Sequence, residues 1–167
     1  RRAGDLKLTH YFERGAVGVS AAISTENDYF SSAVSFDARF NSEDNNTTFA
    51  FGLGGSADRI NSENNVIEDG TKHTREFMLG VTQVLSATQV VQSNLTYTRG
   101  KGYYSDPYKP FDTRPDARNS LAWLTRYNHY FSNLGGALNA SYRYYDDSFG
   151  INSHTLELVW KQPLADT

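Results

Sequence analysis

The sequence predicts an all-β fold: an antiparallel up-and-down transmembrane β-barrel with about 8–10 strands in these 167 residues, as part of a larger barrel. Three observations support this prediction. Apolar and polar residues alternate with a period of two along most of the chain. Aromatic residues make up 14% of a sequence whose mean hydropathy is only −0.59. The connections between alternating stretches are short and long by turns, as in barrels that cross a membrane.

Composition limits the remaining fold and function classes. A chain of 167 residues can form one domain, and no linker-like segment divides residues 1–167. The net charge of −3 arises from interspersed acids and bases, so we expect no basic face and no nucleic-acid partner. Because there is no cysteine, a disulfide framework and thiolate metal sites are excluded, although the compartment is not identified.

No apolar run approaches the roughly 20 residues that a membrane-spanning helix needs. The strands of a transmembrane barrel lack such apolar runs, because their lipid-facing and lumen-facing side chains alternate and keep the average hydropathy low. The chain opens on Arg1-Arg2-Ala3-Gly4 without an apolar stretch, and it ends on Ala165-Asp166-Thr167 without the aromatic last residue of many barrels. We therefore expect a secretion signal and further strands outside this sequence.

Four strands are predicted in the first part of the chain. Leu6, Leu8 and Phe12 alternate with polar residues over 5–13, and after a tight turn the pattern repeats over 17–24. A third strand over 30–40 carries phenylalanine and valine on one side and serine, aspartate and arginine on the other. A polar turn then leads into a fourth strand over 49–56.

Five further strands follow. One spans 72–82 and turns at Ser86-Ala87 into a less regular strand over 91–97. Alternation then returns over 120–128, 138–144 and 155–161. The total is about nine strands, each near the roughly 9 to 11 residues that cross a bilayer when tilted. Because single-chain bacterial barrels have even strand numbers, an odd count also predicts missing strands.

The connections predict two different ends of the barrel. Short turns are expected around Gly15 and at 41–46, 86–87 and 133–136, and generally longer connections at 25–28, 59–71, 102–117 and 147–152. Outer-membrane barrels have short periplasmic turns and longer extracellular loops, whereas a Greek-key sandwich mixes its connection lengths. Aromatic residues near predicted strand ends fit interfacial girdles. They are Tyr29, Phe30, Tyr103, Tyr104, Tyr130, Phe131, Tyr144 and Tyr145.

The four histidines, His10, His73, His129 and His154, fall on the apolar side of different strands. No pair has ligand spacing, so we interpret them as interfacial residues and predict no metal site. The strands also lack the clustered carboxylates and histidine that a catalytic site would need. The sequence therefore predicts neither catalytic residues nor a cofactor.

Charged residues on the polar side of the strands are the first candidate set. We expect them to point into the barrel lumen, where a cross-strand ladder of ion pairs would satisfy them. The alternative is a water-filled pore that selects solutes by charge, although nearly balanced signs argue against strong selectivity. The set is Asp37, Arg39, Glu76, Arg126, Arg143, Glu157 and Lys161, and the same side is expected for Asp5, Lys7, Glu13, Asp58 and Lys72.

The second candidate set lies in the loop 103–116, which holds three of the four prolines together with aromatic and charged residues. We expect this loop to be rigid. It either folds over the barrel mouth or provides a docking surface or gate. The candidate docking residues are Tyr104, Asp106, Pro107, Tyr108, Lys109, Arg114, Pro115 and Asp116.

Six stretches distributed over most of the chain carry a family resemblance. They are Ser24 to Tyr29, Leu79 to Ser86, Gly102 to Lys109, Arg114 to Asp116, Ala140 to Tyr145 and Ser153 to Leu156. The pair Asp-Pro-Tyr-Lys and Arg-Pro-Asp within them is fairly specific. The sequence thereby resembles the outer-membrane β-barrel proteins of domain of unknown function family 3570.

The resemblance implies a longer chain with a signal peptide and further strands on both sides, and it implies no established catalytic residues. Genes of that family often neighbour those for a periplasmic flavin-transferase and a small lipoprotein, so the resemblance also implies a link to extracytoplasmic flavin or electron-transfer proteins.

Together these expectations describe a non-enzymatic protein of the bacterial outer membrane. It would span the lipid bilayer as a porin-like conduit for transport, or as a scaffold for a periplasmic, lipoprotein or cell-surface partner. Two alternatives stay open: an outer-membrane barrel enzyme with its site in the loops, and a soluble β-sandwich binding module.

Overall fold

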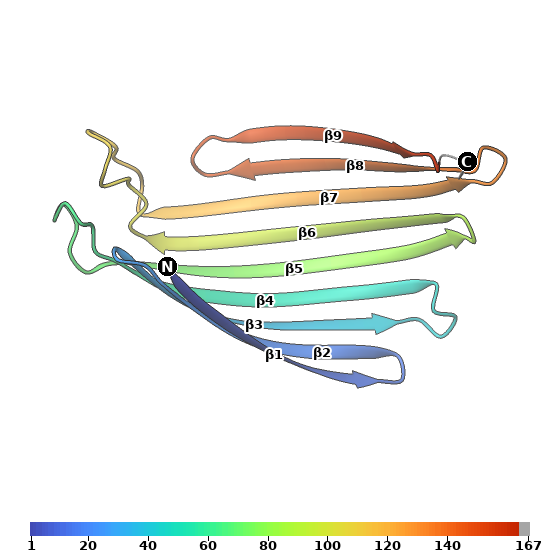
Figure 1. The fold of residues 1–167 in the computed structure, drawn as a ribbon, viewed down its shortest axis with the longest axis horizontal. Coiled ribbons are helices and arrows are strands. Elements are labelled where there is room, and N and C mark those ends of the chain that lie inside the picture. Colours follow the sequence, from blue (N-terminus) through green and yellow to red (C-terminus); the bar gives the residue numbers. More distant parts are fainter. Residues whose placement is uncertain (164–167) are drawn as a thin grey trace.

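Nine strands form one antiparallel sheet in which each strand pairs with the next along the chain (Figure 1). This computed structural model describes residues 1–163, so Ala165, Asp166 and Thr167 lie outside the described residues. The predicted all-β, up-and-down architecture with about nine strands is confirmed. The strands are β1 (Arg2–Phe12), β2 (Gly15–Thr25), β3 (Tyr29–Asn41), β4 (Thr47–Ile60), β5 (Gly70–Ser86), β6 (Gln89–Gly102), β7 (Ala117–Phe131), β8 (Gly136–Asp147) and β9 (Asn152–Lys161).

The register aligns the polar and apolar sides of all nine strands, because successive side chains of a strand point to opposite faces. Leu8 lies opposite Val19, which lies opposite Phe36. A slip of one residue in any pairing would move a whole strand's apolar set to the polar face, so the alternation excludes odd slips and fixes the face of each residue, but not which residues stand opposite one another.

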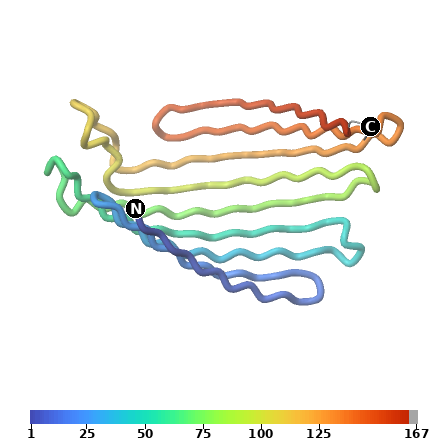
Figure 2. The backbone as a smooth tube through the Cα atoms, viewed as in Figure 1, coloured from blue at the N-terminus to red at the C-terminus, as the bar shows by residue number. Residues whose placement is uncertain are grey.

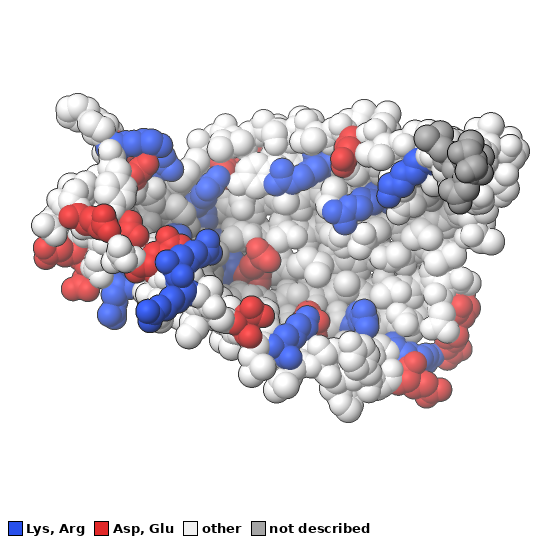
Figure 3. Space-filling view, viewed as in Figure 1, with Lys and Arg blue, Asp and Glu red and all other residues white. Residues whose placement is uncertain are grey.

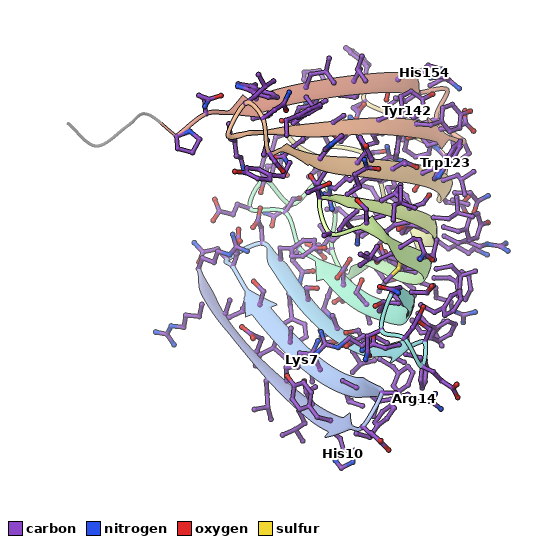
Figure 4. The ribbon with its side chains drawn as sticks, turned by 90° about the vertical axis from the view of Figure 1, so that its right-hand side faces the viewer. Lys7, His10, Arg14, Trp123, Tyr142 and His154 are labelled. Atoms are coloured by element: carbon purple, nitrogen blue, oxygen red, sulfur yellow. The ribbon has the colours of Figure 1, made fainter. Side chains whose placement is uncertain are left out.

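The sheet bends into a trough with its polar face on the concave side (Figure 4). Lys7 lies on the concave side, whereas His10, Trp123, Tyr142 and His154 point away from it. We call the face that carries Lys7 the inner face and the face that carries His10 the outward face. All four histidines share the outward face, as predicted.

The trough is open at both sides. Within residues 1–163, β1 pairs only with β2 and β9 only with β8, and Figure 2 shows these edge strands on opposite sides of the molecule. Closure into a barrel therefore stays a prediction.

The two ends of the sheet differ in their connections, but less regularly than predicted. We call the end with residues 13–14, 42–46, 87–88 and 132–135 the turn end, and the end with 26–28, 61–69, 103–116 and 148–151 the loop end. The loop end carries the two longest connections. The expectation that 25–28 and 147–152 are also long is wrong, because the Glu26 amide donates to the Tyr29 carbonyl at 2.7 Å and the Gly150 amide to that of Asp147 at 3.1 Å, which closes two tight turns.

The described residues contain almost no protein core. Their buried apolar residues are Ala16 and Ala38, whereas large apolar side chains such as Leu79 on the outward face remain exposed. Backbone ladders and outward aromatic pairs hold the sheet together, for example Phe51 with Phe77 at a centroid distance of 5.4 Å. A helix long and apolar enough to cross a membrane does not occur among residues 1–163.

Candidate functional site

All seven charged residues predicted for the lumen project from the inner face. Asp37, Arg39 and Glu76 belong to β3 and β5, and the other four to β7, β8 and β9. The register places them on the same face as Lys7. The hollowed face in Figure 3 accordingly shows basic and acidic side chains interspersed around a largely uncharged centre. Glu13 was assigned to this face by parity, but it lies in the turn after β1, where the strand alternation has ended.

The predicted ladder of ion pairs forms only in places. Lys7 donates to Asp37 at 2.6 Å across Gly18, where a Cβ atom would lie 2.7 Å from the Asp37 carboxylate. Among the residues described, no carboxylate lies within 4.0 Å of the basic groups of Arg39, Arg126, Arg143 and Lys161. Likewise, no basic group among them lies within 4.0 Å of the carboxylates of Glu76 and Glu157. The mid-sheet part of this face therefore carries solvated charge.

Polar and aromatic groups contact these solvated charges instead. The Arg39 guanidinium lies 5.7 Å from the centroid of the Tyr11 ring, and that of Arg143 lies 5.0 Å from the centroid of Tyr145. Glu157 accepts from Ser141 at 3.3 Å, and Glu76 from Thr98 at 3.3 Å. Over β2 to β5 this face has a hollow of about 290 Å³, lined mostly by small residues such as Ser20, Ser35 and Gly54 and bordered by Glu76.

A buried ion pair marks the loop end of the inner face on β4 and β5. The buried Asp58 accepts from Ser31 at 2.6 Å and lies 3.2 Å from the Lys72 ammonium. Lys72 also donates to the Tyr29 hydroxyl at 3.3 Å and lies 5.8 Å from the ring centroid of Tyr104. This cluster ties the base of the loop 103–116 to the strands below it.

A second buried pair lies on β7 and β8. The Asp147 side chain has no exposed surface; one of its oxygens binds the Arg118 guanidinium and the Tyr145 hydroxyl. Its other oxygen accepts from the Phe149 and Ile151 amides at 2.9 and 3.1 Å, which fixes the turn after β8. One aspartate thus organises both the wall and the adjoining turn.

Tyr104 connects these two clusters. Its ring packs edge-on against Phe149 at a centroid distance of 5.5 Å, and Arg118 lies over the same phenylalanine. Its hydroxyl lies directly on Gly100, at the place that a Cβ would occupy. The base of the loop 103–116 therefore folds onto the inner face.

Tyr108 joins three of the four loop-end connections. Its hydroxyl donates to Asp28 at 2.9 Å and accepts from the Glu63 amide at 3.2 Å. Asn64 adds a bond to the Pro107 carbonyl at 2.8 Å. We call the connected segments 26–28, 61–69 and 103–116 the loop collar.

Internal bonds make the loop 103–116 rigid. The Tyr108 amide donates to Asp106 at 3.0 Å, and the Asp106 amide donates to Asp112 at 2.6 Å; these bonds lower the pKa of both carboxyls. Lys109 and Arg114 pair with Asp106 and Asp112 at 3.2 and 3.0 Å. The Asp116 carbonyl accepts from the Gly102 amide at 2.6 Å, whereas Pro115 is exposed.

The tip of this loop presents an unusual aromatic residue. Phe111 is fully exposed and has a φ of 62°, a left-handed conformation that bulky residues rarely adopt. Such strain persists where the surrounding structure imposes it and is concentrated at functional sites. The collar therefore holds one aromatic side chain out into solvent.

The geometry carries no sign of a metal centre. Within residues 1–163, no group of three or more histidine, cysteine or carboxylate side chains could hold an ion. Without such a centre, the inner face can line a passage and the collar can present a surface. A family model described as "Protein of unknown function (DUF3570)" matches residues 1–167.

The chain belongs to the DUF3570 family. No curated protein and no solved structure matches it. The family that the resemblance implied is thus confirmed for this DUF3570 chain.

Several residues that organise the DUF3570 site are absent from the predicted sets. Asp147 was assigned to a connection, Arg118 was placed neither in a connection nor in a strand, and Phe111 was not among the docking residues. The inward position of Arg118 could have been predicted by extending the alternation of β7 towards its N-terminal end, where Arg118 has the parity of Ser120. The girdle assignment was wrong for Tyr29, Tyr130 and Tyr145, which face inward because the register gives them the parity of Lys7. Tyr103 and Tyr104 lie in the loop, and Phe30, Phe131 and Tyr144 face outward.

Proposed function

We propose that this DUF3570 chain is part of a bacterial outer-membrane β-barrel, and that it serves as a non-enzymatic conduit or scaffold for a periplasmic or cell-surface partner. One observation carries the proposal. The outward face exposes large apolar side chains over all nine strands, including Leu8, Leu79 and Leu158, and the described chain provides nothing to cover them.

Lipid fits this face better than water or a second protein layer. Soluble domains bury an apolar face against another sheet or helix, and contiguous exposed apolar patches are rare on soluble monomers. Aromatic residues at the turn end, such as Phe12, Phe131 and Trp160, have the placement of an interfacial girdle. Hydrocarbon in contact with the outward face would remove it from water without any further polypeptide layer.

The inner face supports the conduit part of the proposal. Solvated charges of both signs line it, and small residues leave a hollow over β2 to β5. Mixed charge favours a water-filled passage with little preference between cations and anions.

The loop collar supports the scaffold part of the proposal. It is cross-linked through Tyr108 and presents the exposed Phe111, so a partner would meet a preformed surface rather than a flexible loop. The genomic neighbourhood of the family suggests an extracytoplasmic flavin or electron-transfer protein as partner class.

The test is insertion and conductance of the full-length protein. We expect it to fractionate with outer membranes, to insert into phosphatidylcholine vesicles and to give stepwise conductance in planar bilayers with weak ion selectivity. Insertion without conductance would favour the plugged scaffold over the conduit. A protein that stays in solution without detergent would refute the membrane proposal and favour the soluble sandwich.

The alternative of a loop-borne enzyme site has its own test. It predicts that replacing Asp106, Arg114 and Asp116 abolishes a hydrolase or transferase activity of the purified protein. Because Asp106 and Arg114 bond within the loop, the triple variant must first be shown to keep its collar, for example by unchanged protease sensitivity. Full activity in such a variant would count against this alternative.

A further inference from the structure

Basic side chains gather on the outward face at the loop end of β4, β5 and β6. Arg75 lies directly opposite Arg99, and His73 directly opposite Lys101. Arg59 lies on the adjoining strand opposite Thr71. We call Arg59, His73, Arg75, Arg99 and Lys101 the outward basic patch. It corrects the expectation from overall charge that the molecule has no basic face.

The patch is electrostatically unbalanced. Like charges directly opposite one another in a sheet are destabilising, so the Arg75 and Arg99 pairing calls for a compensating anion. Within residues 1–163, no carboxylate lies within 4.0 Å of the four arginine and lysine side chains of the patch. On the described strands the outward face carries one carboxylate, Asp146, which lies on β8 and accepts from Asn152 at 3.2 Å.

The patch borders the apolar band of the outward face. Arg75 and Arg99 are each two residues from an exposed aromatic ring, Phe77 and Tyr97, on the same face. That spacing along a strand is about 7 Å. Arginine and lysine side chains in such a position hold their charged ends at the height of lipid head groups while their stems lie against apolar surface.

A shallow groove of about 490 Å³ adjoins the patch. His73 and Arg75 form one side of it. The remainder is lined mainly by apolar residues such as Ile23, Val34 and Ala57, together with Ser32, Ser56 and Thr74. A cationic rim beside a largely apolar floor is complementary to a molecule with an anionic head and an aliphatic tail.

We propose that the outward basic patch binds the phosphate of an anionic membrane lipid, with an acyl chain of that lipid in the adjoining groove. This inference rests on the proposed membrane insertion and specifies a ligand for the outward face. Arg75 and Arg99 hold the phosphate between them, and Lys101 and Arg59 add positive charge around it. The loop end is the side on which outer-membrane barrels carry their long loops, so the lipid belongs to the outer leaflet.

The experiment compares lipid retention by two matched double variants of the full-length protein. The proteins are folded into nanodiscs of phosphatidylcholine with a small fraction of diphosphoryl lipid A, extracted gently, and analysed for bound lipid by mass spectrometry. We expect Arg75→Gln with Arg99→Gln to lower lipid A retention about tenfold. Arg126→Gln with Arg143→Gln removes the same charge from the inner face and should retain lipid A like the unsubstituted protein.

Each outcome has a distinct meaning. Equal retention by the two double variants would overturn the lipid site while leaving insertion intact. Displacement of lipid A by millimolar inorganic phosphate as readily as by added lipid A would identify a free-phosphate site and overturn the lipid proposal. A protein that enters neither neutral nor lipid A-containing bilayers would overturn the proposed function and this inference together.

Discussion

The inner and outward faces are built from the same nine strands, yet they are stabilised in opposite ways. On the inner face, polar groups pair with one another, as Asp58 does with Ser31 and Lys72. On the outward face, apolar side chains such as Leu79 contact their strand neighbours and otherwise stay exposed. The difference teaches that the polar face of this fold is satisfied by internal bonds together with water, whereas the apolar face is the one for which we propose an apolar environment outside the described chain.

The comparison is tested most strongly by a charge at mid-strand on each face. Leu79→Lys should lower the free energy of unfolding in vesicles by about 2–4 kcal/mol, because the proposed function places this position, and hence the new ammonium group, in a lipid-facing band. Met78→Lys, one residue earlier on the inner face, faces Gly52 and Thr96 and should have a much smaller effect. Urea titrations of both vesicle-inserted variants make the measurement. Similar losses would mean that the two faces meet similar environments.

The next largest effect concerns the adjacent residues Asp146 and Asp147. Asp147→Ala should destabilise the folded protein by about 1–3 kcal/mol, because it leaves the buried side of Arg118 unpaired and removes two amide acceptors. Asp146→Ala, on the outward face, removes an exposed bond to Asn152 and should change stability by only a few tenths of a kcal/mol. Unfolding midpoints in urea would show the difference; equal midpoints would argue that Asp147 has no organising role.

A smaller effect is expected where glycine admits an ion pair. Gly18→Ala would place a Cβ 2.7 Å from the Asp37 carboxylate and displace the ion pair of Asp37 with Lys7. We expect the free energy of unfolding to fall by about 0.2–1 kcal/mol, because both charged side chains are about half exposed. Gly4→Ala, on the outward face, meets nothing within 4 Å and should cause no loss. A double-mutant cycle with Lys7→Met would isolate the pair, and no coupling between positions 7 and 18 would contradict this account.

The smallest effect is the pH response of the loop collar. Hydrogen bonds lower the pKa of Asp106 and Asp112 from the ordinary 3.8. The largest cause is the bond from the Tyr108 amide for Asp106, and the bond from the Asp106 amide for Asp112. Carboxyls with lowered pKa stabilise a fold above their ordinary pKa and lose that contribution as the pH falls through the lowered value. Hydrogen exchange of the Tyr108 amide, corrected for intrinsic rate, should therefore accelerate below pH 3.8 while the β5 amides stay protected. Parallel acceleration in both would point to global unfolding instead.

Much of the fold could be predicted because alternation is a local property. The parity of Asp37, Arg39 and Glu76 follows from their neighbours along the chain, and the register places all seven charged residues of the first candidate set on one face. Prediction was poor where parity is interrupted. Glu13 lies in a turn, where the alternation has ended. Tyr29 and Tyr130 face inward because the alternation of β3 and β7 continues to the strand ends, whereas their assignment to a girdle rested only on their position near those ends.

The candidate site divides in the same way. The loop 103–116 was recognisable from its prolines and aromatics, but its attachment through Tyr108 to Asp28 and Glu63 joins residues far apart in the chain. The pairing of Arg118 with Asp147 is also long-range and could not be inferred from composition.

The sequence by itself determined that the elements are β-strands, that there are about nine of them, and on which side of the sheet most residues lie, because a period of two follows from backbone geometry alone. Only the tertiary structure decided which charges meet. Register sets Lys7 beside Asp37 across Gly18 and leaves Arg75 opposite Arg99, and these contacts depend on the alignment of neighbouring strands rather than on either strand's own pattern.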